Sequence, residues 1–207
     1  MKIWLFRPFE KVAGWESLTA GLVAVTVTAA IAAVNGQHTD GVLNLHLGPV
    51  APAWVLVVQG LINWLSMSLC LLLFGRCLSG TRFRLIDLFG TQALARWPML
   101  LSVLYLAVPP VGNTLRELTD KLLQAAPQTS SEVIADPAYL LDAIAVTAIS
   151  LPMLGFLAWM AWLMYHGYSL VCNLSGMRAV FSFIGALVTA TIISKSLIWL
   201  LLNSTLN

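Results

Sequence analysis

The chain has 207 residues, of which 59% are hydrophobic and only 10% are charged. Soluble domains carry about 25% charged residues, and the mean hydropathy here is +0.85. The composition therefore excludes an ordinary soluble domain and indicates an integral membrane protein. The net charge of +2 and the lack of a basic patch interleaved with aromatic residues argue against a nucleic-acid partner.

Five stretches are long and apolar enough to cross, as helices, a hydrocarbon layer about 30 Å thick. The chain therefore suits one all-α membrane domain, residues 1–207, with five helices in a single bundle. Before the first span, residues 1–14 mix aromatic and basic side chains, which is typical of a segment at the membrane interface. The predicted spans are about 17–34, 53–74, 85–108, 138–165 and 179–202, with extracytoplasmic loops at 35–52 and 109–137.

Small residues recur at every fourth position of the first predicted span, where they let another helix approach closely. We therefore expect this helix to lie at the centre of the bundle. The residues of this stripe are Ala20, Ala24, Thr28 and Ala32.

The loop at 35–52 contains side chains of the types that bind zinc and related metals, namely His38, Asp40 and His46. Only three such side chains occur there, in a segment with three glycines and two prolines. We therefore favour polar loop residues that hydrogen-bond to backbone or water. Neither a metal nor another cofactor is predicted.

Polar residues of the second predicted span fall on one helix face. Because such groups would lack hydrogen-bond partners in lipid, this face should turn toward the bundle interior. Its members are Gln59, Asn63, Ser66 and Cys70.

The third predicted span carries Gln92 and Arg96 on one face of an otherwise apolar segment. A charge at this depth costs roughly 2.5–3.5 kcal/mol on insertion scales. Asp87 lies on the opposite side of the helix, so we expect it to pair with Arg82 or Arg84 instead. Pro98 should bend the span and free a backbone carbonyl near residue 94.

After the third span, the proline pair at 109–110 is predicted to end the helix, and a capping box at 114–117 is predicted to open a short amphipathic one. The fourth span should be tilted, protruding or bent at Pro152. Asp142 and Lys195 fall at similar heights in the last two spans. Either an interhelical ion pair or snorkelling of the lysine explains them.

Basic residues indicate the orientation of the bundle. Seven of them fall on one side of the predicted membrane and two on the other. By the positive-inside rule the N-terminus is cytoplasmic, and an odd number of spans puts the C-terminus outside. The larger group is Lys2, Arg7, Lys11, Arg76, Arg82, Arg84 and Arg178, and the smaller is Arg116 and Lys121.

This topology places several polar residues near the middle of the membrane. One cation among amides and hydroxyls is what a site for an anion or a zwitterion needs. The amides and a backbone carbonyl could equally satisfy the guanidinium donors as a purely structural arrangement, so both interpretations stand. The predicted cluster consists of Arg96, Gln92, Asn63, Gln59 and Ser150.

The stretch from Arg82 to Leu101, with its Ala-Arg-Trp-Pro segment, resembles the Yip family of five-span membrane proteins. Residues 173–179 and 7–10 resemble the same family. Its eukaryotic members interact with Rab GTPases in vesicle traffic through a chain with a long soluble N-terminal region, which this sequence lacks. The resemblance implies a five-helix bundle of bacterial type, with a cytoplasmic N-terminus, in the cytoplasmic (inner) membrane.

Two functions remain open from the sequence. The leading hypothesis is a non-enzymatic membrane interaction or organising module, whose partners are the lipid bilayer and either a second copy of the chain or another membrane protein. The alternative is a transporter or channel for a small polar or anionic solute that uses the cluster around Arg96. An enzyme is less favoured, because the sequence has none of the common hydrolase, metalloprotease or phosphate-binding motifs.

Overall fold

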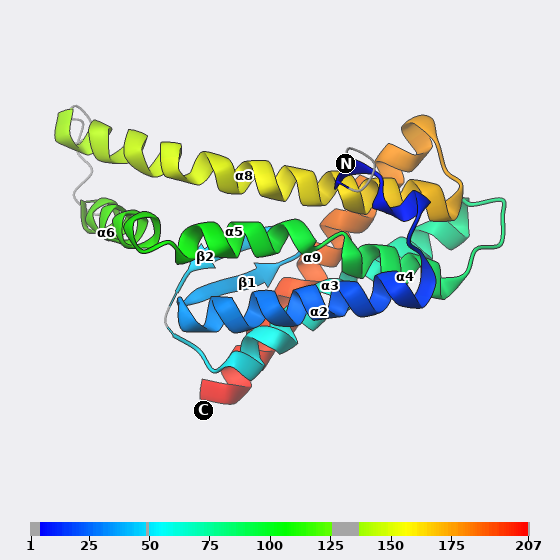
Figure 1. Ribbon diagram of the computed structural model, residues 1–207, viewed down its shortest axis with the longest axis horizontal. Helices are drawn as coiled ribbons and strands as arrows, with labels where there is room; N and C mark the ends of the chain where they lie inside the picture. Colours follow the sequence, from blue (N-terminus) through cyan, green and yellow to red (C-terminus); the bar gives the residue numbers. More distant parts are fainter. Residues whose placement is uncertain (1–4, 49, 126–136, 207) are drawn as a thin grey trace.

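The computed structural model describes residues 5–48, 50–125 and 137–206 as a helical bundle with one small β-hairpin (Figure 1). The hairpin and α6 lie at one end of the bundle, and the described part of the N-terminal segment lies toward the other. The elements are η1 (Pro8–Glu10), α2 (Gly14–Val34), β1 (Gln37–Gly41), β2 (Asn44–Leu47), α3 (Ala53–Leu78), α4 (Leu85–Leu94), α5 (Trp97–Ala107), α6 (Pro109–Ala125), α8 (Pro137–Cys172) and α9 (Gly176–Leu206).

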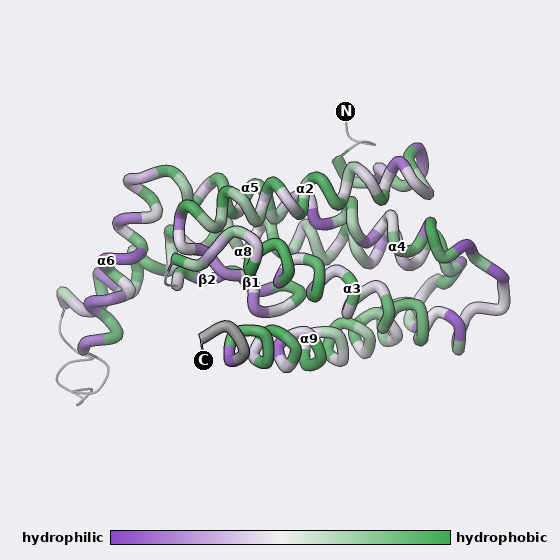
Figure 2. Tube along the Cα trace, turned by 90° about the horizontal axis from the view of Figure 1, so that it is seen from below, coloured by the Kyte–Doolittle hydropathy of each residue, from purple (hydrophilic) through white to green (hydrophobic). Residues whose placement is uncertain are grey.

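Four helices are long and apolar enough to cross a membrane, namely α2, α3, α8 and most of α9. A fifth span depends on a broken segment, in which residues Leu85–Ala107 and Pro109–Gln124 meet at 80°. The described chain is therefore a predominantly helical multi-pass membrane protein with four or five candidate spans. Hydrophobic residues run along α9 in Figure 2, while α6 carries hydrophilic residues among hydrophobic ones.

Helices α2 and α4 cross at close range because small residues line the contact. A Cβ atom on Gly21 would lie 2.3 Å from the backbone of Ala93, and one on Gly90 would lie 2.6 Å from the Gly14 carbonyl oxygen. No larger side chain fits at either glycine unless the helices move apart. Of the predicted stripe in α2, Thr28 and Ala32 are buried, whereas Ala20 and Ala24 are not fully buried.

The polar face predicted for the second span is confirmed to turn inward. All four of its residues are buried in α3, with exposed fractions of 4% or less. Burial of this face leaves the apolar side chains of α3, such as Leu69 and Leu73, on the outside. These residues are Gln59, Asn63, Ser66 and Cys70.

The third predicted span is broken rather than continuous. Helix α4 ends at Leu94, and α5 begins at Trp97 with Pro98 as its second residue. Proline lacks a backbone N–H, so it cannot bond to the Leu94 carbonyl, but it is well tolerated in the first turn of a new helix. The break predicted from Pro98 thus occurs, and it makes Arg96 the residue that joins the two helices.

Two local predictions are wrong. Part of the predicted loop 35–52 forms an antiparallel hairpin, in which Gln37 pairs with Leu47 and His38 with His46. This hairpin buries Val42 fully, which gives the segment an apolar contact that a free loop would lack.

The proline pair at 109–110 begins α6 instead of ending the preceding span alone, so Thr114 lies inside the helix and not at a capping box. Proline at the first helical position needs no N–H partner there, which explains this start. At the other end of the chain, α8 continues through the predicted connection after residue 165 as far as Cys172.

The N-terminal segment packs on α8. The Trp159 Nε1–H donates to the Leu5 carbonyl at 3.1 Å, and the Phe6 and Trp159 rings lie 5.7 Å apart. Phe9 is buried, with its ring 6.5 Å from that of His166. The described part of this segment is therefore held by protein contacts, whatever its position relative to lipid.

Candidate functional site

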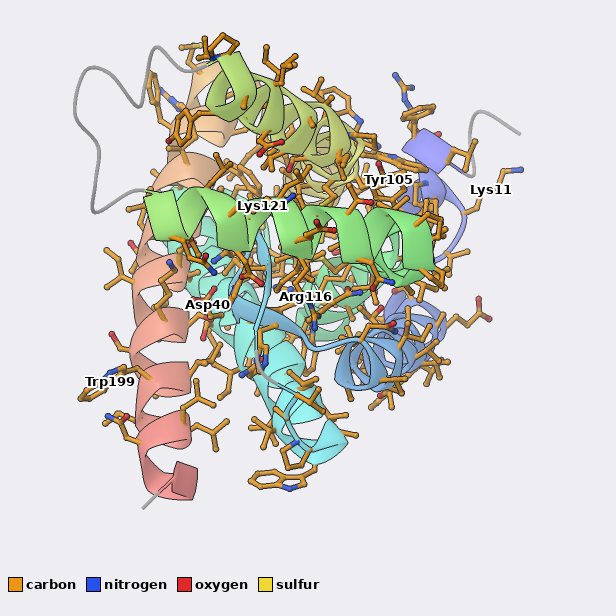
Figure 3. All side chains as sticks on the ribbon, turned by 90° about the vertical axis from the view of Figure 1, so that its left-hand side faces the viewer. Lys11, Asp40, Tyr105, Arg116, Lys121 and Trp199 are labelled. Carbon is orange, nitrogen blue, oxygen red and sulfur yellow. The ribbon has the colours of Figure 1, made fainter. Side chains whose placement is uncertain are left out.

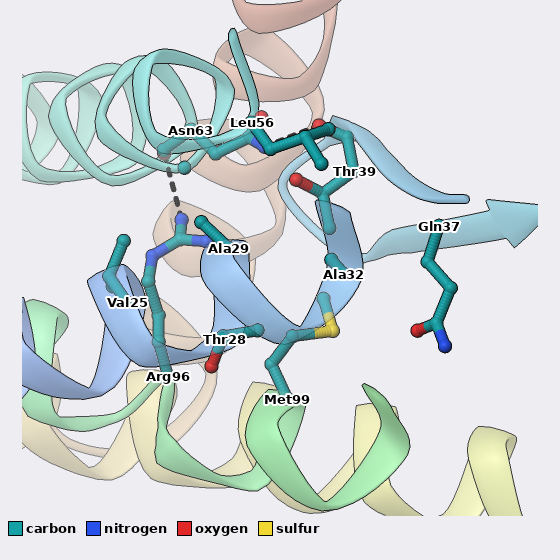
Figure 4. Close-up of a pocket in the computed structure, with 11 residues that line it drawn as sticks. Val25, Thr28, Ala29, Ala32, Gln37, Thr39, Leu56, Asn63, Arg96 and Met99 are labelled. Carbon is teal, nitrogen blue, oxygen red and sulfur yellow. Dashed lines mark hydrogen bonds between the residues drawn. The ribbon is translucent and has the colours of Figure 1, made fainter. Parts of the chain in front are cut away.

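Arg96 is the charged residue that the fold buries most deeply among those described, with 6% of its surface exposed. Its guanidinium reaches from the break between α4 and α5 toward α3, where Nη2 donates to the Asn63 backbone carbonyl at 2.8 Å (Figure 4). Its Nε has no hydrogen-bond partner. No Asp or Glu among the described residues forms an ion pair with it. The site therefore holds a buried positive charge with one hydrogen bond and no protein counter-ion.

A cavity of about 30 Å³ lies beside this guanidinium. A buried water molecule needs at least about 10–15 Å³ of such space, so the cavity has room for water or for a small ion. Residues from α2, β1, α3 and α5 form its wall together with Arg96 (Figure 4). The wall is mostly apolar, with Val25, Ala29, Leu56 and Met99, and its polar members include Thr28, Gln37, Thr39 and Asn63.

Asn63 holds three elements together at this cavity. Its Nδ2 donates to the Thr39 carbonyl of β1 at 2.8 Å, and its Oδ1 accepts a hydrogen bond from the Ser194 hydroxyl of α9. Both ends of the amide are thus occupied by protein, and Arg96 meets the backbone of Asn63 rather than its side chain. The sequence-based cluster placed these two residues together, but through a different contact.

Gln37 is a member of this site that the sequence did not indicate. It is fully buried in β1, and its Nε2 donates to the Val103 carbonyl at 3.3 Å. Its Oε1 has no partner. Because residue 37 falls in a predicted loop, no helical spacing could have connected it with Arg96. Only its position next to the metal-ligand-type residues marked that segment at all.

The other predicted members of the cluster lie elsewhere. Gln92 is buried and its Nε2 donates to the Met164 carbonyl of α8 at 3.0 Å, while its Oε1 has no partner. Gln59 is fully buried, and neither atom of its amide has a hydrogen-bond partner. Ser150 donates to the Val146 carbonyl of its own helix at 2.8 Å and lines a different cavity, next to α6.

Neither of the predicted ion pairs forms. Asp87 pairs with neither Arg82 nor Arg84, and its carboxylate lies beside Gly14 at the start of α2. Lys195 lies against Gly41 of the hairpin instead of meeting Asp142, because α9 packs mainly on α3. The ion pairs among the described residues are Arg7–Glu10 at 3.6 Å, Asp40–His46 at 3.5 Å and Glu117–Lys121 at 3.0 Å.

The hairpin brings the two loop histidines together. The rings of His38 and His46 are stacked with centroids 5.8 Å apart, and His46 Nδ1 lies 3.5 Å from the Asp40 carboxylate. Even so, the described residues contain no group of three or more His, Cys, Asp or Glu side chains that could hold a metal ion. The arrangement fits a ring stack and a carboxylate contact across a hairpin.

Comparison of the chain with protein-family models, curated proteins and solved structures gives no match. The site is therefore interpreted from its own chemistry. A guanidinium presents several planar N–H donors that suit anions. In a low-dielectric interior an unpaired charge is expensive, so an anion or ordered water next to Arg96 would lower the free energy of this site.

Proposed function

We propose that this chain is a non-enzymatic, multi-pass membrane protein that binds a small anion beside Arg96 and acts as a transporter or channel for such solutes. The observation that carries the proposal is the buried guanidinium with an unpartnered Nε and an adjoining cavity. The small volume of the cavity favours a monovalent anion of one or a few atoms. A larger organic acid would require the surrounding helices to move.

Binding is tested first through stability. A ligand that binds only the folded state stabilises it by about 2.7 kcal/mol at a concentration 100 times its Kd. We expect chloride or nitrate, at constant ionic strength, to raise the unfolding temperature of the detergent-purified protein relative to gluconate. Arg96→Met should abolish this difference, whereas Arg84→Met, which changes an exposed arginine, should retain it.

A second variant separates the cavity from the charge. Ala29 is buried and lines the cavity, so Ala29→Leu should fill the space while leaving Arg96 in place. We expect this variant to fold and to lose the anion-dependent stabilisation. Transport is then measured as anion flux into liposomes, which should follow the same order of variants. Equal anion effects in wild type and Ala29→Leu would overturn the proposal.

A second candidate function is the membrane interaction or organising module, and the apolar surface of α9 supports it. This helix packs mainly against α3 and exposes Phe181, Ile192 and Trp199, each by more than 60%. The small residues Ala186 and Ala190 are buried within the chain, so they are not available for self-association. Cross-linking in cells from cysteines introduced at Phe181 or Ile192 would capture a partner, and a monomer without cross-links would exclude this function.

The family and the orientation are part of the same proposal. The Yip-like stretch at 82–101 and the excess of basic residues on one side support a bacterial-type member of that family in the cytoplasmic membrane. They also support a cytoplasmic N-terminus and an external C-terminus. Reporter fusions test the orientation: a C-terminal alkaline phosphatase should be active, and a C-terminal green fluorescent protein should be dark.

A further inference from the structure

A second, larger cavity of about 410 Å³ lies between α6, α8 and β2. We call it the α6 chamber. Buried apolar side chains, including Leu106, Leu115 and Met153, form its floor. Polar side chains, including Arg116, Thr119 and Asp120, also line it, and the first and last of these are exposed. The chamber is thus amphipathic, with an apolar interior and charged groups at the surface.

The charged groups of the α6 chamber do not neutralise each other. Arg116 and Asp120 are four residues apart on one face of α6, a spacing that places Cβ atoms about 5–6 Å apart. They nevertheless form no ion pair, whereas Glu117 and Lys121, at the same spacing on this helix, pair at 3.0 Å. Arg116 donates one hydrogen bond, from Nη2 to the Asn35 carbonyl at 3.1 Å, which directs it toward the hairpin (Figure 3).

Opposite charges about one helical turn apart, above an apolar cavity, match the chemistry of a zwitterionic phospholipid. Its phosphate carries the negative charge, its headgroup nitrogen carries the positive charge a few bonds away, and its acyl chain is apolar. The amphipathic character of α6 and its 80° angle to the preceding segment fit a helix at the membrane interface, where headgroups lie.

We propose that the α6 chamber binds phosphatidylethanolamine, with the phosphate at Arg116, the ammonium at Asp120 and part of an acyl chain against Leu106, Leu115 and Met153. The primary ammonium donates hydrogen bonds to a carboxylate, which a quaternary choline nitrogen cannot do. An anionic lipid lacks the positive group that Asp120 would contact. The site is independent of Arg96 and of anion transport.

Native mass spectrometry of the full chain, released from detergent in the presence of one lipid at a time, tests this site. Phosphatidylethanolamine, phosphatidylcholine and phosphatidylglycerol with the same acyl chains are compared. We expect phosphatidylethanolamine adducts to predominate. Since exposed ion pairs contribute about 0.2–1 kcal/mol, Asp120→Asn should reduce the preference for phosphatidylethanolamine over phosphatidylglycerol by about two- to fivefold.

Matched variants on the same helix provide the controls. Arg116→Gln should weaken binding of all three phospholipids, because each has a phosphate. Glu117→Gln and Lys121→Gln should leave the preference unchanged, because these residues pair with each other and do not line the chamber. Equal binding of phosphatidylglycerol and phosphatidylethanolamine to the wild type would overturn the proposal. An unchanged preference in Asp120→Asn would overturn it as well.

Discussion

Replacement of Arg96 by methionine tests directly whether this charge is structurally paired. The substitution removes the single charge-assisted hydrogen bond to the Asn63 carbonyl, which is worth about 1.5–3 kcal/mol. It also removes a buried Nε without a partner, which costs the folded state about 1–3 kcal/mol. These terms oppose each other, so we expect the free energy of unfolding of Arg96→Met to lie within about 2 kcal/mol of the wild-type value.

The assay is reversible unfolding of the purified protein in mild detergent without a binding anion, so that ligand effects do not enter. Loss of one partner from a buried, well-paired charge costs about 3–5 kcal/mol. A destabilisation of that size would refute the reasoning, because it would mean that the guanidinium has partners besides Asn63. Arg96→Lys, which keeps the charge but shortens the reach, should be less stable than Arg96→Met.

Three further predictions concern packing and buried polar groups. Gly21→Leu should destabilise the protein by about 3 kcal/mol or more in the same unfolding assay, since a side chain would meet the Ala93 backbone, whereas Gly155→Ala, with open space around it, should not destabilise it. Gln59→Leu should be neutral or stabilising by about 1–2 kcal/mol, because its buried amide has no partner, and a marked loss would show that ordered water bonds this amide. Trp159→Phe should expose the N-terminal segment to limited proteolysis by removing the hydrogen bond to Leu5, and unchanged cleavage would contradict this.

Much of the fold follows from local properties of the sequence. Apolar length identifies the candidate spans, because lipid requires about 20 consecutive apolar residues in a crossing helix. Helical spacing identifies the inward face of α3, since Gln59 and Asn63 cannot be left in lipid without partners. The missing N–H of Pro98 predicts the break next to Arg96. Each of these conclusions needs only one helix at a time.

Tertiary structure alone decides which groups meet. Helical periodicity shows that Arg96 and Gln92 share a face, but the packing of α2 against α4 through Gly21 and Gly90 sets which neighbours they reach. Gln92 meets α8, whereas Arg96 meets a backbone carbonyl of α3, an acceptor that every residue carries and no sequence pattern marks. Likewise, the hairpin brings Gln37 to the cavity from a segment with no helical period. Sequence determines the face on which a polar group lies, and packing between distant segments determines its partner.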